Sequence, residues 1–596
     1  MGECHIFTDG IQVGPFSLEQ VRKMLAAEKI SPETPVRFSD GAGETRFMKA
    51  GDFAVPESSP EESPEPPTAE LLSVEPGALR VACPVCGSHY RVDTPSGGKY
   101  YRCLQCENDF QLPSRQRAGS PEDRPESEVP DGDLLCPHCW KSFDPEYVLY
   151  ISEHPDLFGD PVLGEFAHRC FVPTVFNQAG QPLDEKGLPA TDMACPRCHL
   201  RIPARLLDTP TLYFSIAGAI SSGKSHLLTC MTHQLCKTLP EYFGANFRDA
   251  DPRLNETLNS YEKVLFGSLE PEKVTALPAT QISGDGISDR VKLYGTQIEL
   301  PKPFVFEFRS RDGVDDLNMV FYDNSGEMFV PGKDEWVNQA TFHLSHSNGI
   351  IFLFDPTSDA SMRLSICDKR DPQISRNPRV VDQTVLFNEM IDRIRRHANM
   401  LGSDTCRIPL TVAVVKYDTW RGSFDRTLSG LPLTAPKSGG GAEGWSLDLD
   451  KVLDVSFALR ELMLKYVPGL VNAAESFFDS VTFVPVSNFG TLAEQDERGV
   501  IGIVPEKLKP VWVEVPLLVL LAQNDGLIPE GKGSAGEKLG SPVNDQVAFA
   551  HPVSGKPVRL PGNYAGAGIR IGGTLYRLPE LNGDGEFRKT GSRSNV

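Results

Sequence analysis

Apolar residues in the second half of the chain form short runs separated by longer amphipathic stretches. The first run, residues 211–217, leads through a glycine-rich turn into a helical segment that reaches residue 231. Three later runs, rich in β-branched and aromatic residues, end at Asp355, Asp418 and Ser487. Polar turn residues follow each run, and helical patterns at 381–401 and 449–467 lie between them. This alternation predicts a doubly wound α/β domain with a mostly parallel sheet and a ligand site at the carboxyl ends of its strands.

The first 54 residues carry the pattern of a small separate α+β domain. An apolar start and a turn precede a short helix, in which the apolar residues from Leu18 to Leu25 fall on one face. Val36 and Phe38 then alternate as in an edge strand. With Gly14-Pro15-Phe16 before the helix, this pattern resembles the bacterial GYF-like domain family. The resemblance implies a shallow groove for a proline-rich peptide, and the alternative is that the same aromatic residues form the domain core. The aromatic residues concerned are Phe7, Phe16 and Phe38.

Eight of the 14 cysteines fall into four C-x-x-C pairs. In a chain with no secretory signal, such pairs indicate metal binding rather than disulfides. The first two pairs have the spacing of a Cys₄ zinc ribbon, and the second two flank a large insertion, so we predict two zinc ions. The predicted ligands are Cys83, Cys86, Cys103 and Cys106 for one ion and Cys136, Cys139, Cys195 and Cys198 for the other. Further candidates, interpreted as surface residues or neighbours of the ligands, are His138, His154, His168, Cys170 and His199.

The turn after the first apolar run matches the phosphate-binding pattern G-x-x-x-x-G-K-[ST]. Its two glycines let backbone N–H groups point at phosphates, and the following helix adds its positive end. In this interpretation Lys224 reaches the β- and γ-phosphates, and Ser225 binds Mg²⁺. The residues expected to contact the nucleotide are Gly218, Ser221, Ser222, Gly223, Lys224, Ser225 and His226. The alternative, a glycine-rich turn with no ligand, is disfavoured by the apolar strand and the strong helix on either side.

Two more strands are predicted downstream, and the second ends at Asp323. The first begins at Phe304 and alternates apolar and polar residues, so it is expected to run antiparallel to the second. Asp323 would hold Mg²⁺ through water, and the amide of Gly326 would sense the γ-phosphate. Glu327 stands where many GTPases carry the residue that orients the attacking water.

The sequence leaves two details of this region open. Thr280 is favoured over Thr275 as the threonine that completes the Mg²⁺ coordination, although no spacing decides between them. Arg309 and Arg311 are interpreted as solvated side chains, with an arginine finger in cis as the alternative.

The strand that ends at Asp418 carries a candidate base-recognition motif. Val415-Lys416-Tyr417-Asp418 stands where GTPases carry N/T-K-x-D, with valine in place of asparagine or threonine. The carboxylate of Asp418 can accept from two donors of guanine, and the stem of Lys416 can pack on the base. Ser487 and Asn488, after the last strand, are expected to add a contact to the base edge. A solvated Lys–Asp pair at a strand end is the alternative.

The order of motifs from residue 134 to 524 resembles that of the bacterial double-GTPase family, second subtype. The resemblance rests on the series of two zinc-knuckle pairs, GAISSGKS, YDNSGE, IIFLFDPTS, VVKYD, VPVSNFG and PVWVEVPLLVLLA. It implies a TRAFAC-like P-loop GTPase that uses GTP and Mg²⁺ and works beside a partner GTPase, in signalling or biological-conflict systems. The predicted function is a regulatory GTP-binding protein with slow hydrolysis. The alternatives are an ATPase and a non-hydrolysing adaptor whose zinc and GYF-like modules bind protein or nucleic acid.

Charge and hydropathy limit the classes of partner. The formal net charge is −21, so bulk charge does not indicate a protein that coats nucleic acid or an anionic membrane. The longest apolar run, residues 511–522, is interrupted and too short to span a bilayer, and the N-terminus lacks the pattern of a signal peptide. A cytoplasmic location is therefore expected.

Composition sets the domain boundaries that we predict. A chain of 596 residues is long enough for several domains. The glycine- and proline-rich C-terminal segment is expected to be mostly loop, with short strands near 558–560 and 569–578. The predicted segments are a GYF-like domain (1–54), a Pro/Glu-rich linker (55–78), a zinc ribbon (79–112), a linker (113–132), a second zinc-knuckle module (133–208), a P-loop GTPase domain (209–524) and a C-terminal tail (525–596).

Overall fold

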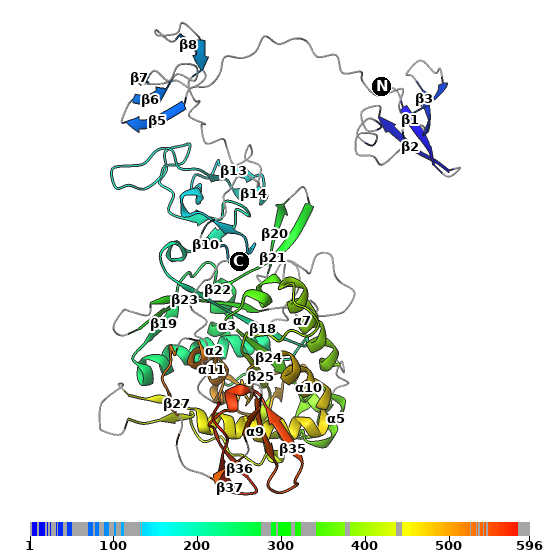
Figure 1. Ribbon diagram of the computed structural model, residues 1–596, viewed down its shortest axis with the longest axis vertical. Coiled ribbons are helices and arrows are strands. Elements are labelled where there is room, and N and C mark those ends of the chain that lie inside the picture. Colours follow the sequence, from blue (N-terminus) through cyan, green and yellow to red (C-terminus); the bar gives the residue numbers. More distant parts are fainter. Residues whose placement is uncertain are drawn as a thin grey trace. The chain divides into compact units, whose positions relative to one another are not determined.

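The computed structural model divides the chain into two compact units, residues 1–118 and 119–596 (Figure 1). In the first unit it describes residues 3–8, 11–17, 21, 24, 31, 34–39, 45–49, 70–75, 78–82, 89–93, 100–102 and 109–111. In the second it describes residues 132, 134–275, 288–293, 296–310, 316–323, 341–375, 382–436, 444–524, 526–531, 533, 537–539, 541–543 and 546–581.

Antiparallel strands make up most of the described part of the first unit, in which Val21 and Met24 are helical. Four of them form a sheet in the order β2-β1-β3-β4. Their bounds are Glu3–Thr8 (β1), Ile11–Ser17 (β2), Pro35–Ser39 (β3) and Thr45–Lys49 (β4). A second sheet consists of β5 (Glu70–Glu75), β6 (Ala78–Ala82) and β7 (His89–Asp93), and β8 (Tyr100–Arg102) pairs with β9 (Asp109–Gln111).

These strands change two predictions. The strand predicted at Val36 and Phe38 is present as β3, but it pairs with both β1 and β4 and is therefore an inner strand rather than an edge strand. The strand β5 lies inside the segment 55–78, for which the sequence predicts an extended linker. The side chains of Phe7, Phe16 and Phe38 and all of Cys83, Cys86, Cys103 and Cys106 lie outside what the structure describes. The peptide groove and the first zinc site therefore stay predictions.

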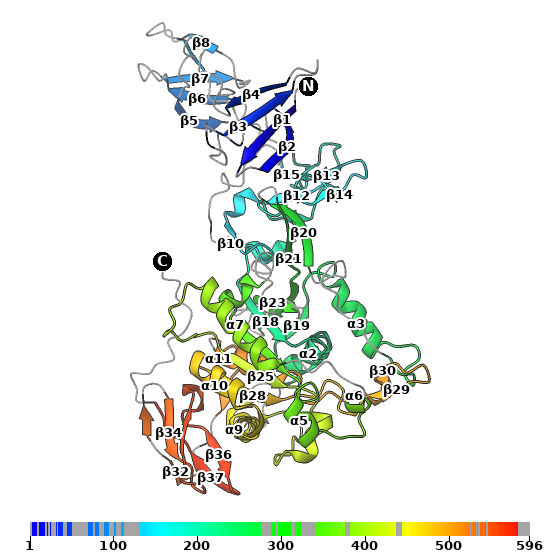
Figure 2. The ribbon, with the colours of Figure 1, turned by 90° about the vertical axis from the view of Figure 1, so that its right-hand side faces the viewer.

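A seven-stranded sheet organises the second unit (Figure 2). Its order is β19-β22-β23-β18-β24-β25-β28, and the five strands from β23 to β28 are parallel. β22 runs antiparallel to both of its neighbours, as the sequence predicts for the strand at Phe304. The bounds are Thr211–Gly218 (β18), Asn246–Asp249 (β19), Phe304–Arg309 (β22), Leu317–Asp323 (β23), Gly349–Phe354 (β24), Leu410–Val414 (β25) and Val481–Pro485 (β28). The predicted mixed, mostly parallel α/β sheet is confirmed.

Helices cover both faces of this sheet, and a separate apolar cluster fills each side. Alternate residues of β24 show the division, since Ile351 and Leu353 belong to one cluster and Ile350 and Phe352 to the other. The first side is covered by α2 (Lys224–Thr238), α3 (Glu256–Phe266) and α11 (Val515–Gln523), and the second by α7 (Gln383–His397) and α10 (Pro468–Phe477). The helix α9 (Leu449–Tyr466) contributes to both clusters. The helices predicted at 381–401 and 449–467 are confirmed as α7 and α9.

The zinc-knuckle module is built from short strands. The four-stranded sheet has the order β15-β12-β16-β17, with bounds Cys170–Phe171, Leu149–Ile151, Met193–Ala194 and Arg201–Ile202. Two pairs accompany it, β10 (Leu134–Leu135) with β11 (Ser142–Phe143) and β13 (Phe158–Asp160) with β14 (Gly164–His168). The hairpin of β20 (Ser288–Leu293) and β21 (Thr296–Pro301) extends from the domain of the seven-stranded sheet and shares an apolar cluster with this module (Figure 2).

The C-terminal segment is folded, contrary to the expectation of mostly loop. Two three-stranded sheets, β33-β34-β35 and β32-β37-β36, pack on α9, where Phe457 contacts Phe549 and Ser456 is hydrogen-bonded to Tyr564. The bounds are Glu537–Lys538 (β32), Ser541–Val543 (β33), Gln546–Ala550 (β34), Pro557–Leu560 (β35), Gly568–Ile571 (β36) and Thr574–Arg577 (β37), so the short strands expected near 558–560 and 569–578 are present. Buried apolar residues such as Val547 and Ile569 stabilise these sheets.

Within the described ranges, no helix has the length and apolar character needed to cross a bilayer.

Candidate nucleotide site and metal centre

The turn between β18 and α2 begins with a backbone conformation that only glycine adopts readily. Gly218 has a φ of 149° and Gly223 a φ of 92°. A Cβ atom on Gly218 would lie 2.7 Å from the carbonyl oxygen of Leu353 on the adjacent strand β24. Ser221 also has a positive φ, of 62°. The loop is therefore sharply curved at the N-terminus of a 15-residue helix, where backbone geometry suits an anion.

Lys224, the first residue of α2, is folded back over this loop. Its Nζ donates to the carbonyl oxygens of Gly218 at 3.1 Å and Ala219 at 2.8 Å. Burial lowers the pKa of Lys224 to about 8, against the opposing effect of the charge on Asp323. Nearby in the loop, Ser222 Oγ is buried and has no hydrogen-bond partner in the part of the chain that the structure describes. A buried ammonium group and a buried hydroxyl without a partner are groups that a phosphate would satisfy.

Ser225 and Asp323 face each other across the ends of α2 and β23. The hydroxyl of Ser225 donates to Asp323 Oδ2 at 2.5 Å, and Asp323 is 5% exposed. Burial raises the pKa of Asp323, whereas Lys224 and Ser225 lower it. A hydroxyl and a carboxylate beside a phosphate cradle form the donor set that Mg²⁺ takes at such sites. The two residues therefore fit a magnesium ion.

Several predicted residues of the γ-phosphate region are not placed. Thr280, Gly326, Glu327 and Arg311 lie outside the described residues. Thr275 is described, and its backbone pairs with that of Ile503 in both directions.

Asp418 and Ser487 meet at the other end of the site. Asp418 belongs to the short helix α8 (Tyr417–Trp420), and its Oδ1 accepts a hydrogen bond from Ser487 Oγ. Ser487 Oγ in turn accepts from the backbone N–H of Gly490 at 2.7 Å. Burial raises the pKa of Asp418 to about 6, although the hydrogen bond from Ser487 opposes this rise. Ser487 therefore fixes Oδ1 of the Asp418 carboxyl group.

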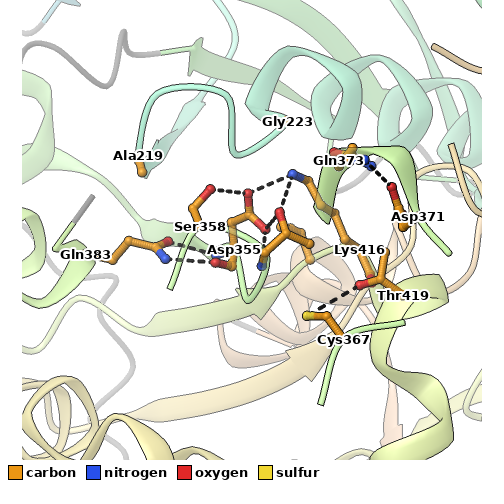
Figure 3. Close-up of polar contacts among 12 residues, drawn as sticks. Ala219, Gly223, Asp355, Ser358, Cys367, Asp371, Gln373, Gln383, Lys416 and Thr419 are labelled. Atoms are coloured by element: carbon orange, nitrogen blue, oxygen red, sulfur yellow. Dashed lines mark hydrogen bonds and ion pairs between the residues drawn. The ribbon is translucent and has the colours of Figure 1, made fainter. Parts of the chain in front are cut away.

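Lys416 lies beside this pair and is bound to Asp355 rather than to Asp418. Its Nζ donates to Asp355 Oδ2 at 2.7 Å and to Thr357 Oγ1 at 2.9 Å, as Figure 3 shows for the Asp355 contact. Asp355 also accepts from Ser358 Oγ at 2.8 Å. Its backbone exchanges two hydrogen bonds of 2.8 Å with the side chain of Gln383, the first residue of α7. Asp355 is fully buried, so this contact is a buried ion pair.

Asn488 connects the base end of the site to the phosphate loop. Its Nδ2 donates to the carbonyl oxygen of Gly223 at 3.3 Å, and its buried Oδ1 has no partner among the described residues. Close by, His226 contacts the ring of Phe489 edge-on at a centroid distance of 5.4 Å. Burial, together with the charge of Lys416, lowers the pKa of His226 to about 4, so the imidazole is neutral at pH 7. Val415 is buried in the core and offers no polar atom from its side chain.

Arg309 is engaged in a cluster around Glu307. Glu307 on β22 is 3% exposed and pairs with Arg205, Arg248 and Arg309. Arg309 also lies 3.9 Å from Asp316. These contacts give Arg309 a structural role within the described residues, and neither Glu307 nor Asp316 belongs to the loop between β18 and α2.

The second group of cysteines is assembled as a metal centre. The sulfur atoms of the four residues lie within 4.8 Å of one another, with 3.8 Å between Cys136 and Cys198 and between Cys139 and Cys195. Tetrahedral coordination at about 2.3 Å requires sulfur atoms about 3.8 Å apart, so the set fits zinc. The two knuckles also match each other, because Trp140 and His199 both have positive φ and each knuckle donates a backbone N–H to its first sulfur at 3.4 Å.

The other candidates from the insertion have different partners. His199 Nδ1 lies 2.9 Å from both carboxylate oxygens of Asp160, which also accepts N–H groups from Val162, Leu163 and Cys170. His138 Nε2 lies 2.9 Å from the carbonyl oxygen of Arg201. Both histidines are buried neighbours of the cysteines rather than surface residues. His154 accepts from the backbone of Asp156, and His168 contacts the ring of Phe158 at a tilt of 32°.

The metal centre is joined directly to the nucleotide sheet. Tyr322, the residue before Asp323, donates its hydroxyl to the carbonyl oxygen of Pro137 at 2.6 Å. Trp140 packs against Tyr213, Tyr322 and His343, with ring centroids 4.7, 5.6 and 6.3 Å away. The strand β23, which carries Asp323, is thus held by contacts with the Cys136–Cys139 knuckle.

Sequence reasoning missed Asp355 and the Trp140–Tyr322 contact. Asp355 ends a strand, and the D-P-T-S turn that follows is the local signal, since Thr357 and Ser358 both bond the carboxylate. Trp140 follows Cys139 directly in the sequence. A large aromatic residue beside a knuckle suggests a packing contact, but the sequence alone does not identify Tyr322 as its partner.

No protein-family model matches the chain, and no curated protein does. Among solved structures, the chain is similar to Era in complex with MgGDPNP and ribosomal RNA (16% identity, 55% of this chain and 59% of that one, TM-score 0.20). It is also similar to nucleolar GTP-binding protein 1 from Plasmodium falciparum (10% identity, 54% and 92%, TM-score 0.20) and to the elongation factor SelB from Methanococcus maripaludis with GppNHp (10% identity, 57% and 41%, TM-score 0.17). The chain spans less than two thirds of the Era chain that it matches. TM-scores this low do not establish a shared overall fold, so function is argued from the site.

Proposed function

We propose that this chain is a regulatory GTP-binding protein that holds GTP with Mg²⁺ and hydrolyses it slowly. The observation that carries the proposal is the convergence of three groups at one edge of the sheet. These are Lys224 over a glycine-bounded loop, the Ser225–Asp323 pair, and the Asp418–Ser487 pair. The sequence order of the three groups is that of a GTPase, and their chemistry matches phosphate, metal and guanine in turn.

The carboxylate of Asp418 supports guanine as the base. Guanine presents two adjacent N–H donors, whereas adenine presents a donor beside an acceptor, so a carboxylate pairs well only with guanine. Val415 in the first motif position leaves an ATPase as the alternative. The Asp418→Asn variant separates these two proposals, because only a guanine reader would then prefer xanthosine triphosphate.

Hydrolysis would rest chiefly on Glu327 and Gly326. A non-hydrolysing adaptor is the second candidate function, because the groups at Lys224, Asp323 and Asp418 would bind a nucleotide whether or not it is hydrolysed. Zinc at two centres, a proline-rich peptide at the GYF-like domain, and a second GTPase as partner belong to the same proposal, and the sequence resemblance supports the last two.

Nucleotide binding and phosphate release by the full zinc-loaded chain test the proposal. We expect Mg²⁺-dependent GTP binding with slow phosphate release, and a loss of affinity of about 100-fold in Lys224→Ala, because a charge-assisted contact to phosphate is removed. Lys465→Ala, an exposed lysine on α9, is the matched control and is expected to bind like the unmodified chain. Binding without phosphate release would favour the adaptor, and no binding would refute the proposal.

A further inference from the structure

Three carboxyl groups surround Lys416, and only one of them holds it. Asp355, Asp371 and Asp418 are 0%, 0% and 8% exposed. Burial raises the pKa of both Asp371 and Asp418, and the charge of Lys416 opposes that rise in each, so both groups feel the ammonium. The hydrogen bonds of Lys416 Nζ nevertheless go to Asp355 and Thr357 (Figure 3).

Asp355 is prepared for this role by its own contacts. Its Oδ1 accepts the backbone N–H and the hydroxyl of Thr357 at 2.8 and 2.7 Å, and its Oδ2 accepts from Ser358 at 2.8 Å. The two bonds between its backbone and Gln383 fix the position of the main chain. A carboxylate held in this way binds an ammonium group without the cost of ordering it first.

Lys416 itself is held in an unusual conformation. Its backbone is left-handed, with φ of 57° and ψ of 39°, which is rare for a residue with a long side chain. Its four-carbon stem leads from this point toward Asp355. The ammonium group at the end of the stem is bonded to Asp355, although Asp418 lies only two residues further along the chain.

We propose that Asp355 is a positioning residue of the base site, which captures the ammonium group of Lys416 and so leaves the carboxylate of Asp418 free to read guanine. This inference rests on the proposed function. Without the charge of Asp355, Asp371 and Asp418 are the buried acids that still interact electrostatically with the ammonium group. An ion pair between Lys416 and Asp418 would compete with the exocyclic amine of guanine for the same oxygens.

The test compares GTP with inosine triphosphate, which lacks the exocyclic amine. In Asp355→Asn, we expect GTP affinity to fall about 10-fold and the preference for GTP over inosine triphosphate to shrink, because Asp418 is occupied. In the double variant Asp355→Asn/Lys416→Met, the competing charge is gone and the preference returns. Asp371→Asn is the matched control, since Asp371 interacts electrostatically with the same lysine but accepts its hydrogen bond from the backbone of Gln373, and the preference of this variant should equal that of the unmodified chain.

Two results would overturn the inference while the proposed function stands. One is an unchanged preference in Asp355→Asn, and the other is a double variant that folds but discriminates no better than the single variant, as a purely structural ion pair predicts. If Asp355→Asn does not fold, as judged by its melting curve, the double variant, which leaves no unpaired buried charge, is compared with the unmodified chain instead. An equal preference for GTP over inosine triphosphate is then expected, and a reduced preference would overturn the inference. Failure of the unmodified chain to bind any nucleotide would refute the proposed function instead.

Discussion

The phosphate end and the base end of the site are built in different ways. At the phosphate end, the functional groups bond to one another or to the loop itself, as Lys224 does with two carbonyl oxygens and Ser225 does with Asp323. At the base end, each functional group has a supporting partner of its own, since Ser487 holds Asp418 and Asp355 holds Lys416. Ligand binding must therefore exchange contacts at the first end, whereas the second is already arranged.

The largest effect is expected from disrupting the cysteine cluster, which contacts β23 next to Asp323. Replacing Cys195 by serine removes one thiolate of the assembled metal centre, and we expect the zinc content to fall by one ion per chain and the free energy of unfolding to fall by about 5 kcal/mol. GTP affinity should fall as well, because Tyr322 loses the fixed carbonyl of Pro137. Metal analysis and denaturant unfolding measure these changes. Cys236→Ser, at an exposed cysteine of α2, is the control and should change neither.

Breaking the base end should change selectivity more than stability. In Asp418→Asn we expect GTP affinity to fall about 100-fold and xanthosine triphosphate to become the preferred nucleotide, because the amide supplies a donor where the carboxylate supplied an acceptor. Competition binding with both nucleotides checks this. Nucleotide preference that is untouched by the change would show that Asp418 does not contact the base.

GTP affinity should fall at both acidic and alkaline pH, because one end of the site limits binding at low pH and the other at high pH. Asp418, with a pKa of about 6, must be ionised to accept from guanine, so GTP affinity falls as the pH drops below about 6. Lys224, with a pKa of about 8, must be protonated to bind phosphate, so affinity falls as the pH rises above about 8. Each limb should approach 10-fold per pH unit, and titration of GTP binding from about pH 5 to pH 9 measures both. The Asp418→Asn variant should lose the acidic limb alone, and a flat profile would contradict the assignment of both groups.

The smallest effect concerns the connection between the two ends. Asn488→Ala removes the hydrogen bond to Gly223, and we expect affinity for GTP and for ATP to fall by the same factor, about 5-fold. An equal loss is expected because the hydrogen bond that is removed joins Asn488 to the backbone of the loop. A change in the ratio of the two affinities would mean that Asn488 contacts the base directly.

The hydrophobic pattern was sufficient to predict the sheet but not all of its surroundings. Strands such as Gly349–Phe354 and Val481–Pro485 are continuous apolar runs because both of their faces are covered, so they stand out in the sequence. The C-terminal strands are short and separated by glycine and proline, and only their packing on α9 shows that they are ordered. Polar spacing likewise pointed to Lys224 and Asp323, whose roles depend on local motifs. Asp355 escaped prediction because its partner Lys416 lies 61 residues away in sequence.

Under the proposed function, we expect the hydroxyl bond from Tyr322 to Pro137 to make nucleotide binding sensitive to oxidation of the cysteine cluster. Pro137 lies between Cys136 and Cys139, two candidate zinc ligands, and a zinc-bound sulfur is lost as a ligand when it is oxidised to a disulfide or a sulfenic acid. Release of the ion would free the knuckle, and with it the carbonyl that fixes Tyr322 next to Asp323. Oxidation of the knuckle would then change the position of Asp323, the candidate magnesium ligand, through the peptide unit that joins it to Tyr322 in β23.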